Sequence, residues 1–70
     1  MERITTKYAL AIAENLFIIG GMAVQSGYYL VFKSDETEQM YFVDFDDPSA
    51  AREMVRLFKS FGHVRCSISV

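Results

Sequence analysis

Several features that usually point to a function are scarce in this sequence. It has one cysteine and one histidine in 70 residues, so it can form neither an internal disulfide framework nor a site with several imidazole ligands. Gly20-Gly21 lacks both the spaced glycines and the following Lys-Ser or Lys-Thr of a phosphate-binding loop. A lone thiol is typical of a reducing compartment. We therefore expect a cytoplasmic protein that holds no cofactor.

A long uninterrupted apolar run is also missing. Residues 8–24 are nearly all apolar, but a run of about 17 residues is shorter than the roughly 20 that a membrane-spanning helix needs. Glu14 and Asn15 would lie near its middle, where a carboxylate is costly. Glu2 and Glu14 also interrupt the pattern of a secretory signal. The sequence therefore predicts no membrane segment.

Basic residues are absent from residues 34–47, and the net charge is −2. This stretch instead holds acidic residues, five of which we expect to form an acidic rim: Asp35, Glu36, Glu38, Asp44 and Asp46. Four of the seven bases follow residue 50: Arg52, Arg56, Lys59 and Arg65. An acidic edge beside a basic helix could dock against another protein or a second copy. The alternative is a solvated turn next to an ordinary helix surface.

What the chain does have is apolar side chains, at 51% of the sequence against 23% charged residues. This balance excludes disorder and indicates a single domain over residues 1–70. It also leaves more apolar surface than so small a domain can easily hide, which favours self-association.

The C-terminal third predicts a helix over about residues 48–61, followed by a strand over residues 63–70. Asp47 and Pro48 form a typical helix start, apolar residues recur at three- and four-residue spacing, and Gly62 provides a left-handed stop. In the strand, alternation directs four apolar side chains inward: Val64, Cys66, Ile68 and Val70. We expect Cys66 to be a buried structural thiol. His63 would lie on the opposite face, which argues against a Cys–His catalytic pair.

The stretch 28–46 predicts a β-hairpin that is apolar on both faces. Alternation directs one set of side chains to the first face: Tyr28, Leu30, Phe32, Tyr41, Val43 and Phe45. It directs a second apolar set to the other face: Tyr29, Val31, Met40 and Phe42. A sheet with one wet face should instead carry polar residues at every second position. Something must therefore cover the second face.

The first 27 residues allow two interpretations. Residues 3–13 alternate, Glu14-Asn15 could form a turn, Gln25-Ser26-Gly27 fits a three-residue hairpin loop, and Gly20-Gly21 would mark a bulge. On this basis we favour α+β class: an antiparallel β-meander of about five strands with the helix on one face. The alternative is an α-β-β-α-β order with an N-terminal helix over Thr6–Ile19, which could cover the second face.

The functional hypothesis is a small non-enzymatic protein–protein interaction module that forms a homodimer, binds another protein, or does both. By analogy alone, phage and mobile-element inhibitors occupy a partner's surface in this way. The predicted interface consists of Tyr29, Val31, Met40 and Phe42, bordered by the acidic rim, because interfaces combine an apolar core with a polar edge.

Two other classes of function stay open. Tyr29, Phe42, Lys33, His63 and Arg65 could share a face that stacks single-stranded nucleic acid, although Asp44 and Asp46 would repel phosphates there. A small enzyme or metal site would need Asp44, Asp46 and His63 to meet in a pocket. No motif supports either class, so we expect no enzymatic activity and no nucleic-acid partner.

Overall fold

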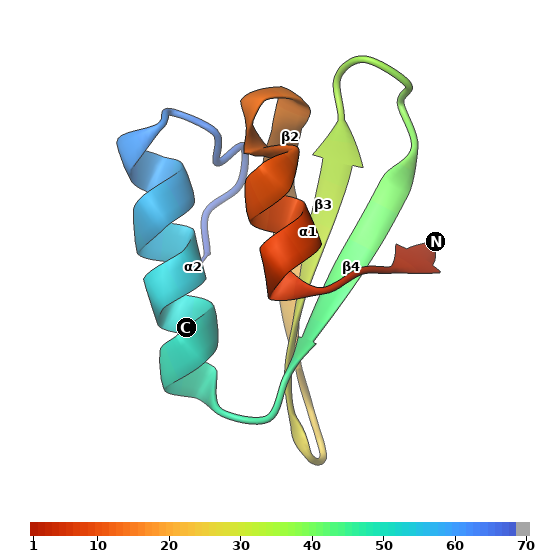
Figure 1. The fold of residues 1–70 in the computed structure, drawn as a ribbon. Helices are drawn as coiled ribbons and strands as arrows, with labels where there is room; N and C mark the ends of the chain where they lie inside the picture. Colours follow the sequence, from red (N-terminus) through yellow and green to blue (C-terminus); the bar gives the residue numbers. More distant parts are fainter. Residues whose placement is uncertain (69–70) are drawn as a thin grey trace.

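The computed structural model describes residues 1–68, and three antiparallel strands form its centre. They are β2 (Leu16–Val24), β3 (Gly27–Ser34) and β4 (Met40–Phe45). A short β1 (Glu2–Arg3) pairs with β4 in the parallel direction. The sheet order is therefore β1-β4-β3-β2, with the first strand of the chain at the edge next to the last one (Figure 1).

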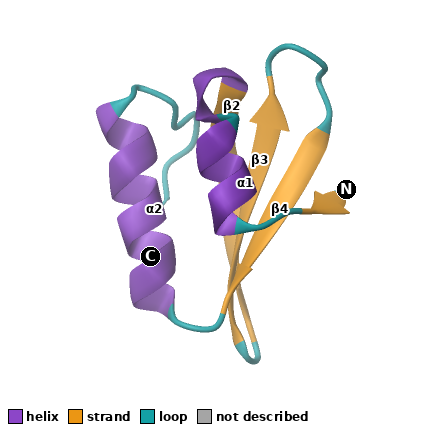
Figure 2. Ribbon diagram, in the orientation of Figure 1, coloured by secondary structure: helices purple, strands orange, loops and turns teal. Residues whose placement is uncertain are grey.

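Both helices pack on the same face of this sheet. Helix α1 (Thr6–Ala11) continues into the 3-10 turn η1 (Ala13–Asn15), and α2 (Pro48–Ser60) follows β4. Figure 2 shows α1 in front of the strands, with α2 to its left. The predicted α+β class is thus confirmed, with one main helix on a four-stranded mixed sheet instead of the expected five-stranded meander.

The core lies between the sheet and the helices. The rings of Phe32 on β3 and Phe58 on α2 meet edge to face with centroids 5.3 Å apart. Thirteen apolar side chains form the buried cluster: Ile4, Ala9, Ala13, Leu16, Ile18, Leu30, Phe32, Val43, Phe45, Ala51, Met54, Val55 and Phe58. They include four of the six inward positions predicted for the hairpin, and the other two, Tyr28 and Tyr41, are partly buried against the cluster.

Local signals explain the position of α2. The Asp47 carboxylate accepts a hydrogen bond from the Ser49 backbone N–H at 3.0 Å, which caps the helix and holds the pKa of Asp47 below its usual value. Pro48 opens the first turn. Gly62 has a φ of 77°, the left-handed conformation that ends helices. The predicted helix is confirmed to within its last residue.

The favoured interpretation of the N-terminus was wrong, because residues 3–13 do not form one strand. Only Glu2–Arg3 forms a strand; the chain then turns into α1, where the Thr5 hydroxyl accepts a hydrogen bond from the Tyr8 backbone N–H at 3.0 Å. This cap and the good helix formers after it outweigh the alternating pattern, since alanine fits either structure. The helix is also shorter than the alternative Thr6–Ile19, and Glu14-Asn15 belongs to the 3-10 turn that leads into β2.

Glycines shape the β2–β3 hairpin. The register shifts between Ile18 and Gly20, as expected of a bulge at the glycine pair. Val24 pairs with Gly27, so the loop has two residues instead of the predicted three. A Cβ on Gly27 would lie 1.9 Å from the carbonyl oxygen of Phe45. Only glycine allows the chain to turn this close to β4.

The strand expected over residues 63–70 is reduced, among the described residues, to a single bridge between Val64 and Ile18. Ile18 donates its N–H to His63 O, and Arg65 donates to Ile18 O, both at 2.9 Å. The bulge in β2 begins immediately after Ile18 and reorients the groups that a longer ladder would use. Val64, Cys66 and Ile68 nevertheless pack against the core as predicted; the predicted inward position of Val70 lies outside the described residues.

Candidate interaction surface

The sheet has a second face that neither helix covers. We call it the outer face. Alternation and register place eight side chains on it: Phe17, Met22, Tyr29, Val31, Lys33, Met40, Phe42 and Asp44. An N-terminal helix does exist, but it joins α2 on the inner face. The cover that a helix was expected to provide is therefore absent from residues 1–68.

Tyr29, Val31 and Phe42 form the centre of the outer face. Val31 lies directly opposite Phe42 in the β3–β4 ladder, and Tyr29 is the diagonal neighbour of Phe42. The rings of Tyr29 and Phe42 lie 5.1 Å apart between centroids, tilted by 34°. Cross-strand pairs of this kind are the usual stabilising units of a sheet. Three of the four predicted interface residues thus form one contiguous cluster.

The exposure of this face is graded. Its three central side chains are half-buried, because they pack sideways on one another and not under another element. Met40, the fourth predicted residue, lies opposite Lys33 at the end of β4 and is 37% exposed. On β2, Met22 is 53% exposed, and a Cβ on Gly20 would meet no atom within 4 Å. The outer face is therefore open to solvent above its centre.

Phe17 and Arg65 extend the outer face at its β2 edge. The Arg65 guanidinium carbon lies 3.8 Å from the centroid of the Phe17 ring, a cation–π contact. The same guanidinium donates two hydrogen bonds to Asp35, at 2.8 and 2.7 Å, and holds the pKa of Asp35 below its ordinary value. Phe17 was not predicted as a site residue, although its position between the inward-facing Leu16 and Ile18 marks it as outward.

The five predicted acidic residues do not form one continuous rim. Asp35, Glu36 and Glu38 lie in the β3–β4 turn, whereas Asp46 follows β4 at the other end of the hairpin. Three of the five are in ion pairs: Asp35 with Arg65, Glu38 with Lys33 at 3.5 Å, and Asp44 with Arg3 at 3.5 Å. Most of the acidic charge around the outer face is therefore neutralised within the chain.

The residues of the enzyme or metal hypothesis are not brought together. Asp44 pairs with Arg3 at the β1 side of the sheet, whereas His63 lies at the β2 edge, with Nδ1 2.9 Å from the carbonyl oxygen of Ala13 and its ring stacked near Phe17. The half-buried Cys66 thiol is 4.0 Å from Ile18 O. Within residues 1–68, no group of three or more ligating side chains could hold a metal ion.

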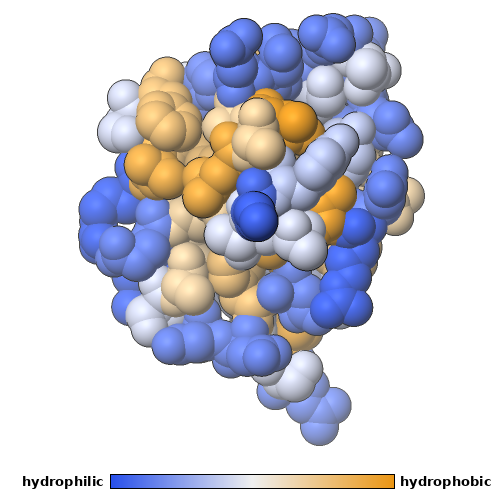
Figure 3. Space-filling view, viewed as in Figure 1, coloured by the Kyte–Doolittle hydropathy of each residue, from blue (hydrophilic) through white to orange (hydrophobic). Residues whose placement is uncertain are grey.

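A second apolar surface lies on the helix side, in a groove of about 480 Å³ between α1 and α2. Figure 3 shows this surface in orange among hydrophilic side chains. Its exposed apolar residues are Leu10 (41%) and Leu57 (40%), with Phe61 (46%) one turn beyond Leu57. Leu57 and Phe61 belong to the apolar residues that recur at three- and four-residue spacing along the predicted helix. Their four-residue spacing on one flank shows that the stripe is wider than the sheet can cover.

None of the helices in residues 1–68 is long and apolar enough to cross a bilayer. Comparisons with protein-family models, curated proteins and solved structures found no match to this chain. The functional interpretation therefore depends on the geometry of its two apolar surfaces.

Proposed function

We propose that this protein is a non-enzymatic interaction module that binds another protein, first of all a second copy of itself, through the outer face of its sheet. The observation that carries this proposal is the contiguous apolar centre formed by Tyr29, Val31 and Phe42 on a face without a helix. An apolar, aromatic centre with a polar border is the usual composition of a protein interface.

The size of the chain sets how much of the face must take part. A stable interface buries about 800 Å² on each partner, close to one fifth of the 4393 Å² accessible surface of this chain. The small central cluster cannot supply this area alone. We therefore include Met22, Met40 and Phe17 in the contact, which then extends over all three long strands.

Charge pairing supports contact between identical faces. In a two-fold symmetric dimer the same patch meets itself, so unpaired charges of one sign would repel their copies. The Arg3–Asp44 and Lys33–Glu38 pairs bring each sign together with its opposite beside the apolar centre. This internal neutralisation lowers the electrostatic cost of stacking two outer faces.

The biological role that follows is a regulator or inhibitor that occupies the surface of a partner in the cytoplasm. Such a role requires shape and affinity but no chemistry at the site. The lone, half-buried cysteine is in keeping with a reducing compartment.

The test is a pair of matched substitutions, Phe42→Asp on the outer face and Phe61→Asp on the helix side. Both replace a surface-accessible phenyl ring by a carboxylate, and Phe61 is 46% exposed. Sedimentation velocity over a range of concentrations should show a dimer for the wild type and the Phe61→Asp variant, and a monomer for Phe42→Asp. Circular dichroism checks that both variants fold.

A wild-type chain that stays monomeric at high concentration would contradict self-association. Loss of the dimer in Phe61→Asp alone would move the interface to the groove between α1 and α2. Should the wild type be monomeric but retain a discrete partner from its source cells in a Phe42-dependent manner, the module would be heterotypic.

A second candidate function is binding of single-stranded nucleic acid on the same face. The observation in its favour is the Arg65 guanidinium stacked on Phe17, on the same face as the Tyr29–Phe42 pair. Against it, the three bases around this face are paired with carboxylates. Fluorescence anisotropy with a labelled pyrimidine oligonucleotide distinguishes the two functions, because phosphate binding weakens steeply with salt.

A further inference from the structure

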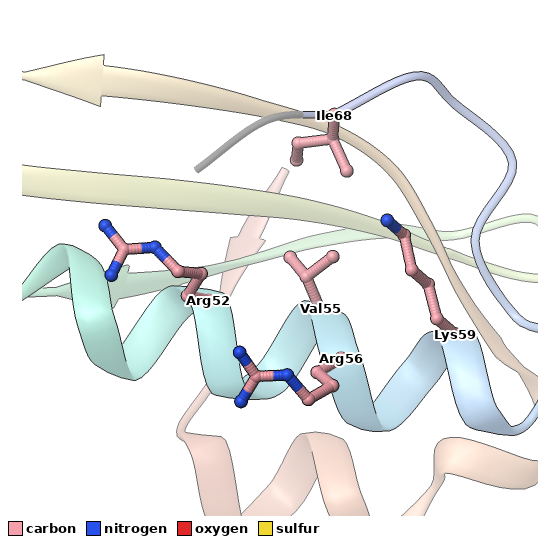
Figure 4. Close-up of a pocket in the computed structure, with 5 residues that line it drawn as sticks. All are labelled: Arg52, Val55, Arg56, Lys59 and Ile68. Atoms are coloured by element: carbon pink, nitrogen blue, oxygen red, sulfur yellow. The ribbon is translucent and has the colours of Figure 1, made fainter.

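Helix α2 carries three bases along one side, at spacings of four and three residues: Arg52, Arg56 and Lys59. Together with Val55 and Ile68 they line a hollow of about 240 Å³ (Figure 4). All five lining residues are basic or apolar. The hollow lies between α2 and the segment that follows it, away from the outer face.

The two apolar residues, Val55 and Ile68, form the rigid wall of this hollow. Val55 is only 5% exposed, so its position is fixed by the core. Figure 4 shows Arg52 and Lys59 extending from α2 on either side of Val55, with Ile68 facing Val55 from the C-terminal segment. Ile68 fits here because residue 21 is a glycine. A Cβ at Gly21 would lie only 2.5 Å from Ile68 Cδ1.

Two acidic side chains of residues 1–68 interact with the bases of this helix. Arg56 forms an ion pair with Glu53 along the helix, and Asp47 interacts electrostatically with Arg52. Lys59 has no ion-pair partner within residues 1–68. Among the described residues, the hollow is therefore lined by three bases and by no acidic side chain, beside a rigid apolar wall.

We propose that this hollow is a binding site for a phosphate group on a small, partly apolar molecule. Arginine guanidinium groups donate paired hydrogen bonds that match phosphate oxygens, and a lysine ammonium adds a compact charge. The volume lies below the range of about 300–1,000 Å³ that is usual for larger ligands. Val55 and Ile68 would contact the apolar part of the ligand. This site is independent of the proposed dimer interface.

The experiment compares inorganic phosphate with phenyl phosphate, which separates a free anion from a phosphate ester. The ¹⁵N-labelled protein is titrated with each at constant ionic strength, with chloride as the balancing anion. We expect saturable shifts of the amides of residues 52–59 and about tenfold tighter binding of phenyl phosphate, as burial of roughly 55 Å² of apolar surface gives. Equal affinities for the two ligands would contradict binding of a phosphate ester and would indicate that the hollow binds a free anion.

Two double variants with the same change in net charge test the location. Arg52→Gln with Lys59→Gln should weaken phenyl phosphate binding by about tenfold or more, whereas Arg3→Gln with Lys7→Gln should leave it unchanged. Equal weakening in both, or shifts no larger than those in chloride alone, would overturn the site. If an oligonucleotide binds across the same helix more tightly than phenyl phosphate, with steep salt dependence, the proposed phosphate site would be wrong and the helix would be part of an extended nucleic-acid-binding surface.

Discussion

The two faces of the sheet have similar apolar content but very different surroundings. On the inner face Leu30, Phe32 and Val43 are almost completely buried. Their neighbours on the outer face, Val31 and Phe42, are only half-buried. Adjacent residues of the same strands thus have different environments, because both helices lie on one side.

The difference shows that the apolar content of a face does not determine whether the chain covers it. The orientation of Ile4 determines which face of the sheet the N-terminal helix covers. Arg3 pairs with Phe42 in the β1–β4 register and forms its ion pair on the outer face, and alternation then turns Ile4 inward, where it is buried. The chain therefore enters α1 from the inner side, and α1 is too short to reach round the sheet.

The largest test of this comparison is a pair of phenylalanine substitutions in neighbouring strands. Phe32→Ala should lower the free energy of unfolding by about 3–5 kcal/mol, close to the whole stability of about 4–10 kcal/mol expected for a chain of this size. Phe42→Ala should cost about 1–2 kcal/mol, because its ring is half-exposed. Urea unfolding at low protein concentration measures both. Equal losses would mean that the outer face is as buried as the inner one.

A smaller effect is expected at the adjacent glycines of β2. In Gly21→Ala the new Cβ would lie 2.5 Å from Ile68 Cδ1 and 2.6 Å from the Tyr28 hydroxyl oxygen, so we expect a loss of about 1–2 kcal/mol from overpacking. In Gly20→Ala the new Cβ meets nothing within 4 Å, and the stiffer chain should gain about 0.4–1 kcal/mol. Thermal unfolding followed by circular dichroism should move in opposite directions. A drop in both melting temperatures would contradict an open space above Gly20.

The smallest effect concerns the ion pair at the edge of the outer face. The hydrogen bonds from Arg65 hold the pKa of Asp35 below its usual 3.8, so the ionised carboxylate is favoured in the folded state. The stability that this pair adds is fully present above pH 3.8 and is lost as the pH falls through the lower folded value.

The matching variant is Asp35→Asn, with Glu36→Gln as the control in the same turn. Melting temperatures measured between about pH 2 and pH 7 should fall less steeply on acidification in Asp35→Asn than in the wild type. The control should keep the wild-type slope. An unchanged acid slope in Asp35→Asn would show that Arg65 does not act through this carboxylate.

The elements that could be predicted from the sequence are those whose signals are local. The start of α2 follows from Asp47 and Pro48, and its end from Gly62, all within a few residues of the helix. The outer-face positions of Tyr29, Val31 and Phe42 follow from simple alternation once the hairpin is recognised. Neither inference requires knowledge of the rest of the fold.

The features that could not be predicted are contacts between segments that are distant in the sequence. The alternation of residues 3–13 fits a strand, and the cap at Thr5 decides against it only because Ile4 is anchored beside β4. The contact of Arg65 with Phe17 and the groove between Leu10 and Leu57 likewise depend on how distant segments meet. Local patterns carry no information about such pairings.

The parallel pairing of β1 with β4 also constrains the order of folding. Glu2 pairs with Tyr41, and Ile4 donates its N–H to Phe42 O at 2.9 Å, so these N-terminal residues have no partner until β4 exists. During synthesis β1 leaves the ribosome before β4 and must wait for it. Contacts of high sequence separation form slowly, and we expect β1 to dock after the hairpins, with the entry of Ile4 into the core as the closing step.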